Sequence, residues 1–291
     1  MEVIRHAGEI RAECAAVRAN GRSLGFVPTM GFFHEGHLSL MRRARAERDA
    51  VVVSIFVNPL QFGPSEDFAS YPRDLERDLA LTEKEGADLV FAPEVDEMYP
   101  HGHPEVTVDP GSIAVRLEGA SRPGHFRGVC TVLARLFHLI GPSRVYLGEK
   151  DAQQLAVVRA MVRDLAFPVE VRGVATVREP DGLAMSSRNT YLSATERGAA
   201  RCLYEALRSA VDAALAGETD APAIADEMRR RIEAEPLASL DYAAVVDEES
   251  FEDVADLERP ARAVVAARVG KPRLIDNVLL PVGENASEEG T

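Results

Sequence analysis

The spacing of apolar and polar residues predicts that strands and helices alternate along the first half of the chain. Leu24 to Thr29 is a short apolar run bounded by turn residues, and Val51 to Val57 is a β-branched run. The stretch between them, Gly36 to Asp49, carries apolar residues at near-helical spacing, which predicts a strand–helix–strand unit. The same alternation predicts further helices and strands at Asp74–Gly86, Asp88–Ala92, Val129–Ile140, Arg144–Leu147, Ala152–Leu165 and Val169–Val174.

This alternation indicates an α/β fold. Short apolar strands that alternate with helices favour a Rossmann-like, doubly wound parallel sheet with helices on both faces. In such sheets, ligands bind at the carboxyl ends of the strands, at the point where the strand order reverses.

The pattern changes from about Thr176, where a loop containing Gly and Ser leads into a long Ala-rich helix. Ser193 is the predicted N-cap of that helix. The helices and strands expected beyond the loop are Ala194–Ala216, Ala223–Ala234, Leu240–Val246, Ala263–Val269 and Arg273–Leu280. We therefore expect a Rossmann-like domain over 1–176, a smaller C-terminal α+β domain over 177–283 and a disordered polar tail over 284–291.

Charge and composition narrow the possible partners. The chain has 33 basic and 47 acidic residues, a net charge of −14, which argues against binding to nucleic acid or to an anionic membrane surface. The first residues lack the pattern of a signal peptide, and no apolar run approaches the length of a membrane span. Cys14, Cys130 and Cys202 lie far apart in the sequence, so we expect reduced core thiols in a cytoplasmic protein.

The segment that joins the Leu24–Thr29 strand to the next helix has the composition of a phosphate site. Gly31 and Gly36 have the spacing of the two P-loop glycines, but His37 and Leu38 stand where a P-loop requires Lys and Ser or Thr. A P-loop enzyme is therefore excluded. What remains is two histidines, His34 and His37, at a helix N-terminus whose N–H groups and dipole favour phosphate.

Two other interpretations of these histidines are open. A single histidine here is more often a capping or core residue than a functional one, and a pair can bind zinc. Zinc needs a further ligand, and the candidates are His101 and His103, which lie in a Pro- and Gly-containing loop that we expect to be solvated. The phosphate interpretation is therefore favoured.

The motif His34-Glu35-Gly36-His37 resembles the HxGH motif of the adenylyl-transferring superfamily that includes the class I aminoacyl-tRNA synthetases. A second segment, Met185-Ser186-Ser187-Arg188, resembles the second phosphate-binding loop of that superfamily. Three more motifs narrow the resemblance to one family of that superfamily; they lie within Ser54–Phe62, Gly148–Gln154 and Asp181–Ala184. From about residue 20 to about residue 280, the chain resembles the pantothenate synthetase family.

The resemblance implies an AMP-forming ligase that joins pantoate to β-alanine through a pantoyl adenylate, and it implies a homodimer. His34, His37 and Lys150 would be the catalytic residues, and Gln61 and Gln154 would bind pantoate, with Gln61 also near β-alanine. The ATP site implied by the family comprises Met30, Gly31, Phe32, Phe33, His34, Glu35, Gly36, His37, Gly148, Glu149, Lys150, Asp151, Val177, Met185, Ser186, Ser187 and Arg188. Phe32 and Phe33 are bulkier than the small residue and the leucine that this family leads us to expect.

Some assignments stay open at this point. ATP chemistry requires Mg²⁺ to screen the phosphates; Asp74 and Asp78, one helical turn apart, could reach the ion or could form a charged, solvated helix face. Arg122 fits either a loop arginine at the site entrance or a solvated side chain.

Three other functions share parts of this pattern. One is another HxGH nucleotidyltransferase. An aminoacyl-tRNA synthetase would need an anticodon-reading domain and a basic surface, which this chain does not offer. A non-catalytic nucleotide-binding protein would keep the phosphate cradle but lose the histidines, the lysine and the glutamines.

Overall fold

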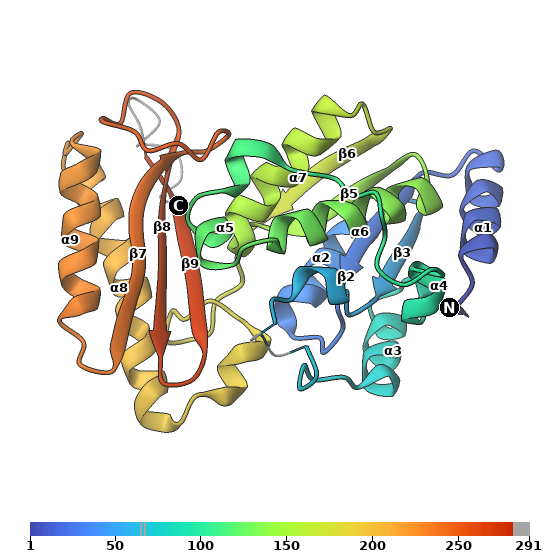
Figure 1. Ribbon diagram of the computed structural model, residues 1–291, viewed down its shortest axis with the longest axis horizontal. Coiled ribbons are helices and arrows are strands. Elements are labelled where there is room, and N and C mark those ends of the chain that lie inside the picture. Colours follow the sequence, from blue (N-terminus) through green and yellow to red (C-terminus); the bar gives the residue numbers. More distant parts are fainter. Residues whose placement is uncertain (65, 67, 282–291) are drawn as a thin grey trace. The chain divides into compact units, whose positions relative to one another are not determined.

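A computed structural model describes residues 1–64, 66 and 68–281, and it divides the chain into two compact units (Figure 1). The first unit contains Met1–Glu149 and Gln153–Ala175. The second contains Lys150–Ala152 and the residues from Thr176 onward. The expected tail over 284–291 lies outside the described residues.

A six-stranded parallel sheet forms the centre of the first unit, with the strand order β1-β4-β3-β2-β5-β6. The strands are β1 (Glu2–Ile4), β2 (Leu24–Thr29), β3 (Ala50–Ile55), β4 (Leu89–Phe91), β5 (Ser143–Gly148) and β6 (Val169–Val174). The order reverses between β2 and β5, which pair through Gly25 and Arg144. This topology confirms the expected doubly wound sheet, and the carboxyl ends of β2 and β5 mark the point where ligands bind in such folds.

Helices cover both faces of this sheet. The helices are α1 (Ala7–Ala19), α2 (Glu35–Glu47), α3 (Leu75–Lys84), α4 (Val95–Met98), α5 (Glu118–Ser121), α6 (His125–Ile140) and α7 (Ala152–Asp164). Because successive strand residues point to opposite faces, Val52 of β3 packs in a core with α1, α6 and α7, whereas Val51 and Val53 pack in a second core with α2. Each buried strand is therefore apolar on both faces, which explains its continuous apolar sequence.

The described residues also contain four short 3₁₀ segments: η1 (Pro59–Gln61), η2 (Gly111–Ala114), η3 (Glu149–Asp151) and η4 (Ser187–Tyr191). The sequence pattern missed β1 and α1, so the strand–helix–strand unit that begins at Leu24 is not the start of the sheet. It also placed the beginning of α6 one turn late. That helix begins at His125, after Gly124, whose φ of 85° turns the chain into the helix.

The second unit is built on a three-stranded antiparallel sheet in the order β7-β8-β9. Its strands are β7 (Ala238–Asp247), β8 (Ala261–Val269) and β9 (Arg273–Leu280), and its helices are α8 (Ala194–Leu215) and α9 (Ala221–Glu233). The two helices pack on one face of the sheet and close a core with it (Figure 1). Ser193 caps α8 as predicted: its hydroxyl accepts from the N–H of Glu196, whose carboxylate accepts from the N–H of Ser193.

The three cysteines are free and buried, as expected for core thiols, and burial raises the pKa of each to about 12. Among the described residues, no helix has both the length and the apolar character that a membrane crossing requires.

Candidate active site

The loop after β2 is held by a buried carboxylate. Gly31 and Phe32 both have left-handed backbone conformations, with φ of 84° and 53°. Asp78 of α3 accepts hydrogen bonds from the N–H groups of Phe32 (2.5 Å) and Phe33 (2.9 Å). A Cβ on Gly31 would lie 2.9 Å from Oδ2 of Asp78, so the turn needs glycine at this position. The hydrogen bonds to the buried carboxylate of Asp78 therefore hold the loop in this strained, left-handed conformation.

Asp78 corrects an expectation drawn from the sequence. Its side chain is 1% exposed, so a solvated face is wrong at this position. Burial raises the pKa of the carboxyl group, and the two N–H donors oppose that rise. Asp74 is the N-cap of α3 and accepts from the N–H of Arg77 at 3.1 Å. The two aspartates therefore have different structural roles, although they lie one turn apart.

The two histidines of the HxGH motif cap α2. His34 is the N-cap residue, and its Nδ1 accepts from the N–H of Gly36 at 3.1 Å. Nδ1 of His37 accepts from the N–H of His34 at 3.4 Å, and the ring centroids lie 4.2 Å apart. Because Nδ1 accepts in both rings, the hydrogen-bond pattern assigns the proton of each neutral imidazole to Nε2. Capping thus sets the tautomer in which each ring offers an Nε2–H donor.

Gly36 makes this arrangement possible. A Cβ at this position would lie 2.8 Å from Cε1 and 2.9 Å from Nδ1 of His34, closer than a carbon atom can approach. The glycine of the motif therefore leaves room for the imidazole that caps the helix.

The two phenylalanines in the loop have separate environments. Phe33 is 1% exposed and belongs to the core that α2 forms with the sheet. Phe32 is half-buried, and the guanidinium of Arg77 lies 5.5 Å from the centroid of its ring. Arg77 also donates to the carbonyl of Phe33 at 2.8 Å. Both rings therefore have packing partners: Phe33 lies in the core, and Phe32 lies beside Arg77.

Gln61, at the end of η1, lies next to Met30. Its Nε2 donates to the sulfur of Met30 at 3.1 Å, and its Oε1 accepts from Nδ2 of Asn58 at 3.1 Å. Asn58 is 1% exposed and is itself fixed by the hydroxyl of Tyr99 and the carbonyl of Gly128. The structure thus brings together two residues that the sequence assigned to the site, and it orients the amide of Gln61 through a buried partner.

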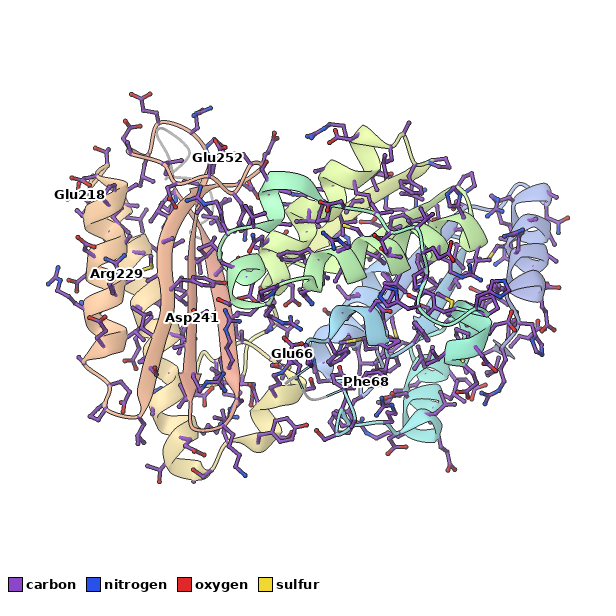
Figure 2. All side chains as sticks on the ribbon, viewed as in Figure 1. Glu66, Phe68, Glu218, Arg229, Asp241 and Glu252 are labelled. Carbon is purple, nitrogen blue, oxygen red and sulfur yellow. The ribbon has the colours of Figure 1, made fainter. Side chains whose placement is uncertain are left out.

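A second group of side chains holds the main chain of Gln61. Arg122 binds both carboxylate oxygens of Glu66, at 2.7 and 2.8 Å (Glu66 is labelled in Figure 2). Nδ1 of His125 donates to the carbonyl of Gln61 at 2.9 Å, and Nε2 accepts from Arg122 at 3.1 Å. Burial, together with the adjacent guanidinium, lowers the pKa of His125 to about 4. Arg122 is therefore an ion-paired residue rather than a solvated one, and no sequence pattern indicates its partners Glu66 and His125.

Two adjacent glutamines at the start of α7 differ in environment. Gln153 is 4% exposed; its Oε1 accepts from the N–H of Glu118, and its Nε2 donates to the carbonyls of Ile113 and Arg116. It therefore fixes the segment that leads into α5. Gln154, the predicted pantoate ligand, is half-buried.

In the second unit, a side chain of β9 binds the main-chain carbonyl of Lys150. The carbonyl of Lys150 accepts from Nδ2 of Asn277 at 2.8 Å, and its side chain, 20% exposed, lies 3.7 Å from the carboxylate of Asp151. The side chain of Lys150 is thus only partly exposed, while the backbone that carries it is anchored.

The segment that carries Met185–Arg188 folds back on itself. The N–H of Met185 donates to the carbonyl of Val177 at 3.0 Å, and Arg178 forms an isolated bridge with Ala184. Val177 is thereby brought next to the four-residue loop to which the family assigns triphosphate contacts. Within the loop, the hydroxyl of Ser186 accepts from the N–H of Arg188.

The two other histidines considered as metal ligands lie in the segment between α4 and η2. His101 and His103 are exposed. Over residues 1–64, 66 and 68–281, the structure contains no cluster of three or more His, Cys, Asp or Glu side chains suited to a metal ion.

A doubly wound parallel sheet with a helix cap of two imidazoles after β2, where the strand order reverses, defines the class of HxGH nucleotide-binding α/β enzymes. The sequence model of the pantoate-beta-alanine ligase family matches residues 2–279, and the chain belongs to this family. The chain is therefore a ligase that forms a carbon–nitrogen bond, and the resemblance seen in the motifs is confirmed.

Known relatives match nearly the whole chain. A pantothenate synthetase of Roseiflexus sp. (strain RS-1) is 54% identical over 280 residues, 96% of this chain and 99% of the relative. The crystal structure of pantothenate synthetase from Thermus thermophilus gives a TM-score of 0.89 at 50% identity, covering 96% of this chain and 99% of that one. The pantoate-beta-alanine ligase of Francisella tularensis, complexed with beta-gamma ATP and beta-alanine, gives 0.78 at 33% identity, covering 96% and 97%.

Proposed function

We propose that this chain condenses (R)-pantoate with β-alanine to give pantothenate in two half-reactions. In the first, a carboxylate oxygen of pantoate attacks the α-phosphorus of ATP and pyrophosphate leaves, which gives pantoyl adenylate. In the second, the β-alanine amine attacks the acyl carbon, loses a proton and displaces AMP. The observation that carries the proposal is the pair of imidazoles capping α2 after β2, where such sheets bind nucleotides.

The residues of the first unit would act on the phosphates and on pantoate. His34 and His37 would donate from Nε2 to phosphate oxygens as negative charge moves to the leaving pyrophosphate, which is where preorganised donors contribute most. Met30 to His37 would line the ATP site. Gln61 and Gln154 would bind pantoate, because a neutral amide can donate to a carboxylate and accept from a hydroxyl without adding charge. The contacts of Gln61 with Asn58 and Met30 support this role, since they hold its amide in one orientation.

The remaining ATP contacts would come from the turn after β5 and from the second unit. Gly148 and Glu149 would contribute from that turn, followed by Lys150 and Asp151. Lys150 would contact the phosphates as a compact cation. Val177 would contact adenine through its backbone, and the loop of Met185, Ser186, Ser187 and Arg188 would close on the triphosphate.

ATP would be used as its Mg²⁺ complex, with phosphate oxygens and water as the main ligands of the ion. Asp78 does not fit as a ligand, because the side chain is buried and its two oxygens accept from the N–H groups of Phe32 and Phe33. We also propose a homodimer in the cytoplasm; the free buried thiols are compatible with a reducing compartment, and light scattering measures the mass of the assembly.

The decisive experiment omits β-alanine. Enzyme, ATP, Mg²⁺ and pantoate alone should release about one pyrophosphate per active site in a burst, because the adenylate accumulates when no amine is present. Bridging oxygen-18 in ATP should exchange position as the step reverses. Pantoyl lactone, which lacks the carboxylate, is the matched control and should give no burst.

Two other results would replace the proposal. Pyrophosphate and AMP that appear only when all three substrates are present would indicate a concerted route without an adenylate. No pyrophosphate under any of these conditions would indicate a nucleotide-binding protein without this activity.

A further inference from the structure

Two consecutive polar residues lie in the middle of β9, an otherwise largely apolar strand. Asp276 and Asn277 are 3% and 4% exposed. Because neighbouring residues of a strand point to opposite faces, the two side chains reach different parts of the second unit. Asn277 contacts Lys150, and Asp276 contacts the hairpin that leads into the Met185–Arg188 loop. The proposed function assigns phosphate contacts to Lys150 and to that loop.

Asp276 holds the segment before the Met185–Arg188 loop. Its two oxygens accept from Nη1 and Nη2 of Arg178 at 2.6 and 3.0 Å. Arg178 also donates to the carbonyl of Gly182 at 3.1 Å, and its guanidinium lies 4.5 Å from the centroid of the Tyr204 ring on α8. A Cβ on Gly182 would lie 2.1 Å from that ring. The hairpin that delivers the loop is therefore fixed to both the sheet and the helix.

Asn277 holds Lys150. Its Nδ2 donates to the carbonyl of Lys150 at 2.8 Å, and its Oδ1 accepts from Nη1 of Arg262 at 2.6 Å. Arg262 is 5% exposed and also binds Glu248 at 2.9 Å. The side-chain amide of Asn277 is thus oriented on one side by a buried cation, and this orientation aims its donor at Lys150.

The two contacts belong to one network. Oδ1 of Asp276 accepts from the N–H of Asn277 at 2.7 Å, and Arg178 donates to the carbonyl of Asn277 at 3.3 Å. A buried ion pair adds little net stability compared with apolar residues of the same size, because both charges lose their hydration. Its geometry, in contrast, is specific, because the guanidinium binds the carboxylate through two hydrogen bonds.

We propose that Asp276 and Asn277 are positioning residues that fix the backbone of Lys150 relative to the Met185–Arg188 loop. Two consecutive residues of β9 then set both cationic contacts to the triphosphate, from Lys150 and from Arg188. The inference rests on the proposed function, since it is that function which assigns phosphate contacts to these two segments.

The first test uses Asn277→Asp, which keeps the size and the acceptor for Arg262 but removes the donor to Lys150. Misplacement of a catalytic group lowers the rate without preventing folding, so we expect the pyrophosphate burst to slow about tenfold at saturating ATP. The burst amplitude should stay near one per site, and the concentration of pantoate that gives half the maximal rate should not change.

The second test uses Arg178→Lys, which keeps the charge but not the paired hydrogen bonds. We expect the ATP concentration for half the maximal burst rate to rise about fivefold, because the loop is held less firmly. This variant also tests the proposal if Asn277→Asp does not fold. The matched control is Asp241→Asn on β7 (Figure 2), which removes the charge of a carboxylate that accepts from Nε of Arg273 at 2.7 Å on the same sheet. Its burst should equal that of the unchanged chain.

Three results would overturn the positioning role: a wild-type burst rate and ATP dependence in the folded variants, a reduced amplitude at the wild-type rate, or an equal loss in the control. The second of these would mean that part of the protein is misfolded and that the residues act on stability alone. An unchanged chain that gives no burst would overturn the proposed function, and the positioning role with it.

Discussion

The two segments to which the proposed function assigns phosphate contacts are anchored in different ways. The loop after β2 is held at its centre, where buried Asp78 accepts from two consecutive N–H groups. The 177–188 segment is held mainly near its ends, where Arg178 binds Asp276 and Asn189 donates to Glu179 at 2.8 Å. The N–H of Met185 also donates to the carbonyl of Val177 at 3.0 Å. Between these anchors, the side chains of the Met185–Arg188 loop are only half-buried.

This difference in anchoring predicts that the two segments contribute differently to the reaction rate and to ATP affinity. A loop fixed at its centre presents donors that do not need to reorganise during the reaction, which is what stabilisation of a transition state requires. A loop whose side chains are only half-buried can adapt to a bound triphosphate. We therefore expect substitutions in the first segment to act mainly on the rate, and substitutions in the second to act on ATP affinity as well.

The largest effect is expected for His37→Ala. Removal of one donor to the developing charge should slow adenylate formation about 10²–10³-fold, while ATP binding changes little. Single-turnover pyrophosphate release and equilibrium ATP binding separate the two quantities. His103→Ala, at an exposed loop position, is the control and should leave both unchanged. An unchanged single-turnover rate in His37→Ala would remove this residue from the mechanism.

Lys150→Gln should affect both quantities. The substitution keeps most of the length of the side chain but removes the charge that the proposed function places against phosphate, so ATP affinity and adenylation rate should each fall about tenfold. Lys84→Gln, in the exposed last turn of α3, is the matched control. Near-native turnover in Lys150→Gln would make this residue an ordinary surface lysine.

Asp78→Asn tests the central anchor of the first loop. An asparagine offers one acceptor oxygen to two N–H groups, and the group left unpaired in the interior should cost about 1–3 kcal/mol of unfolding free energy. Urea denaturation measures this loss. Asp74→Asn is the control on the same helix, because asparagine is as good an N-cap as aspartate. Equal stability of the two variants would mean that Asp78 does not anchor the loop.

The smallest effect concerns His125, which supports the backbone of Gln61. Its pKa is lowered from 6.5 to about 4 in the folded state, so the unfolded chain binds a proton that the folded chain excludes as the pH falls below 6.5. Stability is therefore lost as the pH falls through this window, and His125 should account for about 1 kcal/mol of the loss between pH 7 and pH 5.5.

His125→Gln should remove that part of the pH dependence. Urea midpoints at the two pH values measure it, and His138→Gln, on the exposed side of the same helix, should keep the wild-type slope. The same slope in His125→Gln would contradict a neutral, buried imidazole and the fixed position of Gln61 that it supports.

Local sequence patterns were sufficient for most of the fold. β2, β6 and β9 have the bounds that the apolar runs predict. α1 was missed although its pattern is present: Ile10, Cys14 and Val17 recur at helical spacing and face the core. β1 gave a weaker signal, because three residues are too few to show a period.

The candidate site was predictable where its residues are close in sequence, as for His34 and His37. The residues that hold the site in place were not predictable, because they lie far in the sequence from the residues that they bind. Asp78 caps a loop 45 residues away, and Arg178 meets Asp276 across 98 residues. No periodicity connects such positions, so only the folded chain shows which charged residues hold the site and which are solvated.

The hydrogen bond between Asn277 and the carbonyl of Lys150 also sets an order of events during synthesis. The two residues are 127 positions apart, so Lys150 leaves the ribosome well before its partner is made. At 5–20 residues per second, the interval is roughly 6–25 s. During that time the first unit can already fold around its parallel sheet, since domains fold as units during synthesis. The lysine to which the proposed function assigns a phosphate contact acquires its anchor only when β9 emerges. On that proposal, a nascent chain completes the loop after β2 long before it can use ATP.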